Sequence, residues 1–237
     1  MSAAPAAATA RFAPDHLVVA ARTLEEGAAW CEATLGVVPA PGGKHSMMGT
    51  HNRLLSVGSA RLPRLYLEII AIDPDAPPPA RARWFDLDAR ALQQAIAVSP
   101  RLVHWAARSD DIEAGIATLR AAGHDPGAAI AAERMTPRGL LRWRMALRDD
   151  GRRLADGAVP LLIEWGEVHP CDALADSGVS VEWIAVAGID AALAAALGVT
   201  PAPAGAPPLA VRLATPRGRV ELAAPAPASR RSPPRSS

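Results

Sequence analysis

The chain is poor in cysteine, aromatic residues, lysine and long apolar runs. Its two cysteines, Cys31 and Cys171, lie far apart and in no CxxC or CxxH spacing, so neither a disulfide framework nor a structural zinc site is expected. Aromatic residues make up 4% of the chain and the formal net charge is only +1, which argues against a nucleic-acid partner. No apolar stretch approaches the ~18 residues that span a bilayer, so we expect no membrane partner.

Half of the 237 residues are hydrophobic, which is enough for a buried core in one large or two small domains. The first residues, MSAAPAAATARFAP, have no charged start and no strong apolar centre, so they make a poor signal peptide. We therefore expect a cytoplasmic protein. Composition also predicts a disordered leader at 1–13 and a disordered Pro/Ser/Arg tail at 225–237.

An internal repeat organises the sequence between these ends. The first copy begins at His16 and reads HLVVAARTLEEGAAWCEATLGV, and the second begins at His104 and reads HWAARSDDIEAGIATLRAAGHD. Each copy predicts a short strand, then an amphipathic helix that starts at a capping side chain and stops at a glycine. The expected caps are Thr23 and Asp110, each followed three residues later by a glutamate.

Both copies continue into strand-like segments and end with a carboxylate inside an apolar run. The first ends in RLYLEIIAID, which contains Glu68, and the second in VPLLIEWGE, which contains Glu164. A shorter third copy supplies a strand, a helix and a hairpin, but it has no histidine in its first strand. The sequence therefore predicts an α+β fold of paired βαβββ modules with a truncated third βαββ-type repeat. The expected borders are 14–98 for the first module with a linker helix, 99–176 for the second module and 177–224 for the third repeat.

The histidine and the acid recur at the same places in both copies, which suggests a shared role. Burying an unpaired carboxylate among apolar residues is costly, and one divalent cation would remove that cost for two carboxylates at once. Imidazole and carboxylate together suit Zn, Ni, Co, Mn or Fe. We therefore predict that one divalent metal ion is held by His16, Glu68, His104 and Glu164, with positions left open for water or substrate.

These segments also resemble a known family. The resemblance lies in HLVVAART, HWAARSDD and the acids within LYLEIIA and LLIEWG, which are similar to the vicinal oxygen chelate superfamily of glyoxalases, bleomycin-resistance proteins and extradiol dioxygenases. The segment GGKHSMMGTHNRLLSVG resembles, more narrowly, its glyoxalase-like subgroup. The resemblance covers about residues 14–168. It implies that the two modules curl into a partly open mixed-sheet barrel and that the predicted ligands converge on one metal ion.

Two further segments predict contacts with a substrate. The first, GGKHSMMGTHN, contains His45, His51 and Asn52 beside glycines that permit close approach to a ligand. In the second copy, Arg142 and Arg144 would share one face of a strand, and arginine suits carboxylate or phosphate groups. We predict that these five residues bind a small, anionic substrate.

Three functions follow from this set of residues. The leading hypothesis is a metal-dependent lyase or isomerase, in which the ion chelates two adjacent oxygens of a small oxygen-rich substrate and stabilises an enediolate. Glu164 or Glu68 would serve as the catalytic base. One alternative is an Fe(II) extradiol-type dioxygenase, and another is a metal-free protein that binds or sequesters a small molecule in the same barrel. The third repeat could complete a homodimer.

Overall fold

The computed structural model of the chain describes residues 10–136 and 139–225. Most of the predicted leader and tail therefore lies outside the described residues, although the first strand already begins at Phe12. The first module contains β1 (Phe12–Ala20), α1 (Leu24–Leu35), β2 (Ala40–His45), β3 (Thr50–Ser56) and β4 (Tyr66–Ile72). A short 3-10 turn, η1 (Trp84–Asp86), and the helix α2 (Arg90–Val98) connect it to the second module.

The second module repeats this order of elements, with short turns added. It contains β5 (Arg101–Ser109), α3 (Ile112–Ala121), β6 (Ala128–Thr136), β7 (Gly139–Leu147), η2 (Leu154–Gly157), β8 (Leu161–Trp165) and η3 (Pro170–Asp172). The third repeat contains β9 (Ser180–Val186), α4 (Ala191–Ala196), β10 (Thr200–Pro201), β11 (Leu209–Thr215) and β12 (Gly218–Ala223). None of the described helices is long and apolar enough to cross a bilayer.

The two modules share one eight-stranded sheet with the order β2-β3-β4-β1-β5-β8-β7-β6. At its centre β1 and β5 run antiparallel, with His16 opposite Ala106 and Val18 opposite His104. On either side, β4 runs parallel to β1, and β8 runs parallel to β5. This pairing relates the modules by an approximate twofold axis, which makes His16 and His104 equivalent. The predicted α+β fold class is confirmed.

The first turns of the two main helices show why they start where they do. Thr23 accepts a hydrogen bond from the backbone N–H of Glu26 and caps α1, as predicted. In α3 the cap is Asp111, one residue later than expected, and it accepts from two backbone N–H groups of the first turn. Asp110 instead pairs with Arg11 before β1, so its carboxylate joins the two modules rather than starting the helix.

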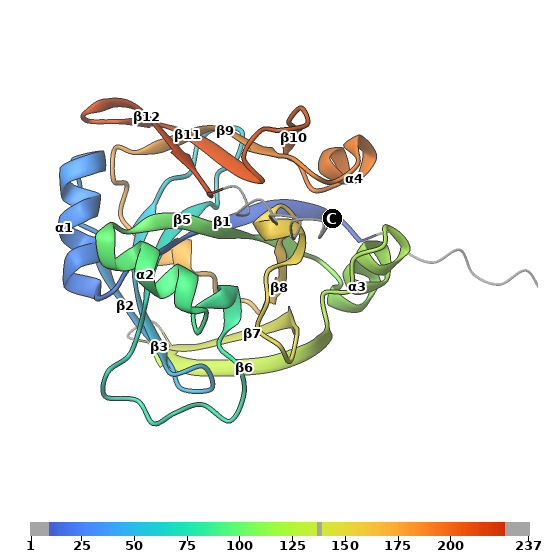
Figure 1. The fold of residues 1–237 in the computed structure, drawn as a ribbon, viewed down its shortest axis with the longest axis horizontal. Helices are drawn as coiled ribbons and strands as arrows, with labels where there is room; N and C mark the ends of the chain where they lie inside the picture. Colours follow the sequence, from blue (N-terminus) through green and yellow to red (C-terminus); the bar gives the residue numbers. More distant parts are fainter. Residues whose placement is uncertain (1–9, 137–138, 226–237) are drawn as a thin grey trace, which may run out of the picture.

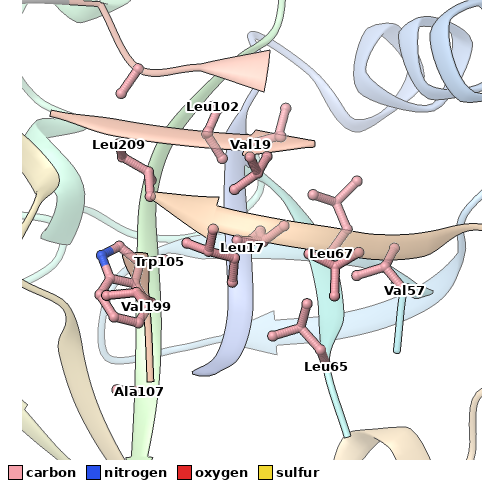
Figure 2. Packing of buried hydrophobic residues seen from close by; sticks show 14 of the residues in the cluster. Leu17, Val19, Val57, Leu65, Leu67, Leu102, Trp105, Ala107, Val199 and Leu209 are labelled. Carbon is pink, nitrogen blue, oxygen red and sulfur yellow. The ribbon is translucent and has the colours of Figure 1, made fainter. Parts of the chain in front are cut away.

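Strand alternation gives the eight-stranded sheet two different faces. Its outer face carries Leu17 and Val19 and packs in one core with α1, α3 and the four-stranded sheet β10-β9-β11-β12. In Figure 1 this second sheet lies over β1 and β5. Figure 2 shows Leu17, Trp105 and Leu209, all fully buried, in the layer between the sheets. The inner face carries Val18 and a second buried cluster that includes η1.

Candidate functional site

A pocket lies on the inner face of the sheet, where the seven strands β1 to β4 and β6 to β8, together with η1, supply most of its walls. Its lining combines apolar walls with a few polar groups, which is the usual composition of a small-molecule site. The polar and charged side chains other than tryptophan are His16, His45, Asn52, Tyr66, Glu68 and Arg134.

Asp15 lies behind His16 and is fully buried. One of its oxygens, Oδ1, is 2.8 Å from Nδ1 of His16. The other, Oδ2, is 3.0 Å from Nε2 of His169 and accepts from the indole N–H of Trp165 at 3.1 Å. Burial alone would raise the pKa of Asp15, but the hydrogen bonds from His16 and His169 outweigh it and lower that pKa to about 2. Asp15 is therefore an ionised acceptor, so His16 donates from Nδ1 and presents Nε2 to the pocket.

Glu68 faces His16 across the pocket. The distance from His16 Nε2 to Glu68 Oε2 is 3.9 Å. Asn52 donates from Nδ2 to the other oxygen, Oε1, at 2.6 Å, and His45 Nε2 lies 3.8 Å from that same oxygen. Asn52 thus fixes one carboxylate oxygen of Glu68, while the second oxygen is turned toward His16.

His45 stands at the other side of Glu68 as a neutral imidazole. Its Nδ1 lies 3.0 Å from the hydroxyl of Thr50, and its Nε2 lies 3.3 Å from Nδ2 of Asn52. Burial lowers the pKa of His45 to about 4, against the opposing effect of the Glu68 carboxylate. Both ring nitrogens therefore have polar neighbours within the protein.

Aromatic rings complete the pocket. Tyr66 stacks on His16 with 4.7 Å between ring centroids, and burial raises the pKa of Tyr66, which keeps its hydroxyl protonated. The apolar walls come from Trp84, Phe85 and Trp143 together with other side chains of the inner face. Such walls exclude water and strengthen the electrostatic interactions inside.

Arg134 is the arginine that lines this pocket. It comes from β6, opposite Leu141 on β7. Its Nε and Nη1 atoms are buried and have no hydrogen-bond partner within residues 10–136 and 139–225. Gly43 leaves the space that the guanidinium occupies, because a Cβ at Gly43 would lie only 1.6 Å from Nη1 of Arg134.

His104, the twofold equivalent of His16, lies in a separate cavity of about 370 Å³. Trp84, Phe85 and Leu161 line both cavities and form the partition between them. The ring of Phe85 is 5.1 Å from that of His104, whose imidazole is buried. Burial, reinforced by the charge of Arg153, lowers the pKa of His104 to about 3.

Glu164 differs most from its expected place, because it lies on the outer face of the sheet. Its Oε2 accepts from the backbone N–H of Ile112, the first residue of α3, at 2.7 Å. Its Oε1 lies 3.6 Å from Nη1 of Arg144. Glu164 thus compensates the free N–H groups and the positive end of a helix instead of entering the pocket.

The register of the strands explains this difference. Val18 pairs with Glu68 in the first module, and the twofold equivalent of Val18, Ala106, pairs with Leu161 in the second. Leu161 therefore stands where the second module would need an acid. Glu164 lies three residues further along β8, which turns it to the opposite face.

The predicted metal centre can be tested against this arrangement of donors. Within the described residues, no group of three or more His, Cys, Asp or Glu side chains is placed to hold a metal ion. His16 and Glu68 remain as one facing pair, with Nε2 of His16 3.9 Å from Oε2 of Glu68. The residues present do not fit the four-ligand centre that the sequence predicts.

Of the five residues that were predicted to bind substrate, two line the pocket and three do not. His45 and Asn52 line the pocket. His51 lies between Thr50 and Asn52 on β3, so alternation turns it away from Asn52. Arg142 and Arg144 do share a face, but it is the outer one, where they pair with Glu133 and Glu113.

Two supporting residues, Asp15 and His169, were not predicted, and Arg134 belongs to the same arginine-rich stretch as Arg142 and Arg144 but was not chosen with them. Asp15 stands next to His16 in the sequence, and an acid beside a candidate ligand histidine is a signal that could have been used. His169 is separated from Asp15 by 154 positions, so no local pattern could reveal their contact. Arg134 lies one strand away from the arginines that were chosen.

Comparison with known proteins places the fold. A family model described as a glyoxalase-like domain matches residues 15–202. A hypothetical protein from Staphylococcus aureus is similar in structure, with a TM-score of 0.52, 15% identity and coverage of 90% of this chain and 86% of that one.

Two methylmalonyl-CoA epimerases are more distant. The Streptomyces coelicolor enzyme, in complex with 2-nitronate-propionyl-CoA, has a TM-score of 0.40, 17% identity and coverage of 66% and 96%. The Mycobacterium tuberculosis enzyme has a TM-score of 0.37, 17% identity and coverage of 68% and 91%. No curated protein matches the sequence. At 15% identity, the likeness to the Staphylococcus aureus protein shows the fold alone.

Proposed function

Because the chain belongs to the glyoxalase-like domain family of the vicinal oxygen chelate superfamily, we propose that it is a lyase or isomerase that moves a proton within a small, oxygen-rich, anionic substrate. The observation that carries this proposal is the pair formed by His16 Nε2 and Glu68 Oε2, which face each other at 3.9 Å in a largely buried pocket. A substrate that lies against both groups can lose a proton to one and receive a proton from the other.

The two groups have different supports, which suggests different roles. Asn52 donates to Oε1 of Glu68, so Oε2 is the oxygen left to take the carbon-bound proton. Asp15 holds the His16 ring in one orientation and stabilises its protonated form whenever the ring takes up a second proton. His16 can then donate from Nε2 to the substrate oxygen on which negative charge develops. Return of the proton from Glu68 to the neighbouring carbon, while His16 takes up the proton of the other hydroxyl, completes an isomerisation and restores both side chains.

A divalent ion is the cofactor that the family resemblance implies. His16 and Glu68 are the two side chains still placed to contact one, while His104 lies behind Phe85 and Glu164 lies on the outer face. Since the donors do not form the expected set, the proposed proton transfer relies on protein side chains alone.

Hydrogen–deuterium exchange tests the proposal, because it detects removal of the substrate proton whatever the product is. The protein is mixed in D₂O with a panel of small 2-hydroxy and 2-oxo acids, and proton NMR follows the carbon-bound proton. We expect exchange with a panel member, and we expect Glu68→Gln to slow it about 100-fold or more. The matched control is Glu164→Gln, which makes the same chemical change outside the pocket and should exchange at the wild-type rate.

Binding without exchange would contradict the proposal and support a sequestering protein instead. If no acid of the panel binds, the proposal of a small anionic substrate is contradicted.

Elemental analysis of the same preparations measures how much divalent metal the protein holds. One divalent ion per chain, lost in Glu68→Gln and kept in Glu164→Gln, would support the metal-dependent form of the reaction. Exchange that persists in a chelator would support the form that uses side chains alone. The cytoplasmic setting and the homodimer stay predictions.

A further inference from the structure

The inner pocket contains the half-buried guanidinium of Arg134, for which the described residues supply no ion pair. The guanidinium of Arg134 has two buried nitrogen atoms, Nε and Nη1, without a hydrogen-bond partner among the described residues. Arg142 and Arg144 on the neighbouring strand, by contrast, are both paired with glutamates. Leaving a buried charged group unpaired is costly, so such a group usually has a partner that comes from outside the chain.

The chain is shaped to hold Arg134 in this position. Gly43 of β2 packs against the guanidinium, and a Cβ there would lie 1.6 Å from Nη1. The backbone N–H of Gly43 donates to Oδ1 of Asn52 at 2.7 Å, and Asn52 in turn donates to Glu68. The φ angle of Gly43 is not positive, so glycine is needed here for space and not for backbone conformation.

Arg134 also stands between two cavities. An outer pocket of about 730 Å³ lies between β2 and its loop on one side and β6 and β7 on the other. The residues that it shares with the inner pocket are His45, Trp84, Arg134, Trp143 and Met145. A molecule that enters through the outer pocket therefore meets the guanidinium before it reaches His16 and Glu68.

We propose that Arg134 binds the carboxylate of the substrate, and that the substrate is a carboxylic acid with an oxygen on the carbon next to the carboxylate. A planar guanidinium can donate to both oxygens of a carboxylate. Arg134 and Glu68 line the same pocket, so a carboxylate on Arg134 holds the neighbouring carbon in the pocket that contains Glu68. The second part of this inference rests on the proposed proton transfer.

The charges of the pocket favour a carboxylate over a phosphate. A phosphate monoester carries about −1.5 to −2 charges at pH 7. The inner pocket offers one unpaired cation, Arg134, and already contains the carboxylate of Glu68. Lys44, which lines the outer pocket, is taken up by Asp73 at 2.7 Å. A single negative charge is therefore the best match.

Calorimetric titration with glycolate, acetate and inorganic phosphate tests the inference. Glycolate has an oxygen on the carbon next to the carboxylate, whereas acetate lacks it. We expect wild-type protein to bind glycolate more tightly than acetate or phosphate, and Arg134→Gln to weaken glycolate binding roughly 10- to 100-fold. Arg134→Lys keeps the positive charge but loses the planar guanidinium. Its affinity for glycolate should therefore lie between that of wild type and that of Arg134→Gln.

Two further variants act as controls. Arg142→Gln makes the same change on the outer face and should bind glycolate like wild type. Gly43→Ala keeps Arg134 but displaces its guanidinium, so it should weaken binding in the wild-type background and have no further effect in Arg134→Gln. Because Arg134→Gln removes an unpaired buried charge, its thermal midpoint should not fall.

Unchanged glycolate affinity in Arg134→Gln, equal affinity for phosphate, or the lack of saturable binding to wild type would overturn the inference. Its failure can be told apart from failure of the proposed reaction. Arg134-dependent binding without deuterium exchange leaves the anion site intact and removes the reaction. Deuterium exchange that is equally fast in wild type and Arg134→Gln would support the proposed reaction and remove the anion site.

Discussion

Buried imidazoles on the inner face bind protons differently in the folded and unfolded chain. The folded pKa of His104 is lowered to about 3 and that of His45 to about 4, in both cases mainly by burial. Free imidazole titrates near pH 6.5. Below this pH, His45 and His104 are protonated in the unfolded chain but stay neutral in the folded chain until the pH approaches their lowered pKa values. Above about pH 6.5 these groups do not lower the free energy of unfolding. As the pH falls from there toward their folded pKa values, the free energy of unfolding decreases.

We therefore predict that His104→Leu flattens the acid side of the stability profile. Between pH 6 and pH 4 each such histidine costs up to about 1.4 kcal/mol of unfolding free energy per pH unit, and the variant removes one of them. Urea denaturation at several pH values measures the slope. Leucine fills a similar volume beside the apolar ring of Phe85, so stability at pH 7 should be kept. A variant with the same slope as wild type would contradict the neutral state of His104.

Some residue-level features could be predicted from the sequence and others could not. His16, Glu68, His45 and Asn52 do line one pocket. The choice of arginines failed on alternation: Trp143 and Met145 are the apolar residues of β7 that face inward, so Arg142 and Arg144 between and before them must face outward. That pattern is visible in the sequence. The contact of Arg134 with Gly43 joins strands at the two edges of the sheet, and no local pattern carries such information.

At the level of elements, the strand β8 and the helix α3 are joined by the carboxylate of Glu164. It accepts the N–H of Ile112 at 2.7 Å and lies near Arg144. The sequence repeat suggested a second copy of Glu68, because both acids follow apolar runs of similar length. A strand, however, exchanges its faces with every residue, so the offset of three residues between Leu161 and Glu164 reverses the environment of the side chain.

We predict that Glu164→Ala destabilises the protein by about 1–2 kcal/mol, because a helix N-terminus loses an acceptor and a favourable charge. Denaturant titration measures the loss. Glycolate affinity should be unchanged, since the carboxylate is on the face opposite the pocket. Weaker ligand binding at full stability would mean that Glu164 serves the pocket after all. Glu133→Ala, which removes an exposed partner of Arg142, is the control and should change stability by less than about 0.5 kcal/mol.

On the scale of the whole molecule, the third repeat is part of the main core. Its buried side chains, including Leu209 and Val211, belong to the same cluster as Leu17 of β1 and Leu35 of α1. The sequence predicted the repeat and its elements from periodicity, together with the paired modules. How the repeat packs was not predictable, because an apolar strand face shows that it must be covered without showing by what.

We predict that the chain unfolds in one cooperative transition and that Leu209→Ala lowers the stability of the whole molecule by about 2–5 kcal/mol. Leu209 is fully buried between the two sheets (Figure 2). Circular dichroism and tryptophan fluorescence, followed together in denaturant, should give coincident curves. Val98→Ala is the control, since Val98 is 84% exposed. Two separate transitions, with only one moved by Leu209→Ala, would show that the third repeat folds on its own.

The carboxylate of Asp15 has a consequence for how the protein is made. Its partners Trp165 and His169 follow it by 150 and 154 positions, so on a ribosome they emerge roughly 8–30 s later. During that interval the newly made N-terminal half holds an anion that it cannot bury without cost. The first half can therefore complete its folding around Asp15 only after the second half has been translated. A prematurely terminated chain would leave the Asp15 carboxylate without Trp165 and His169, and we expect cellular quality control to degrade it.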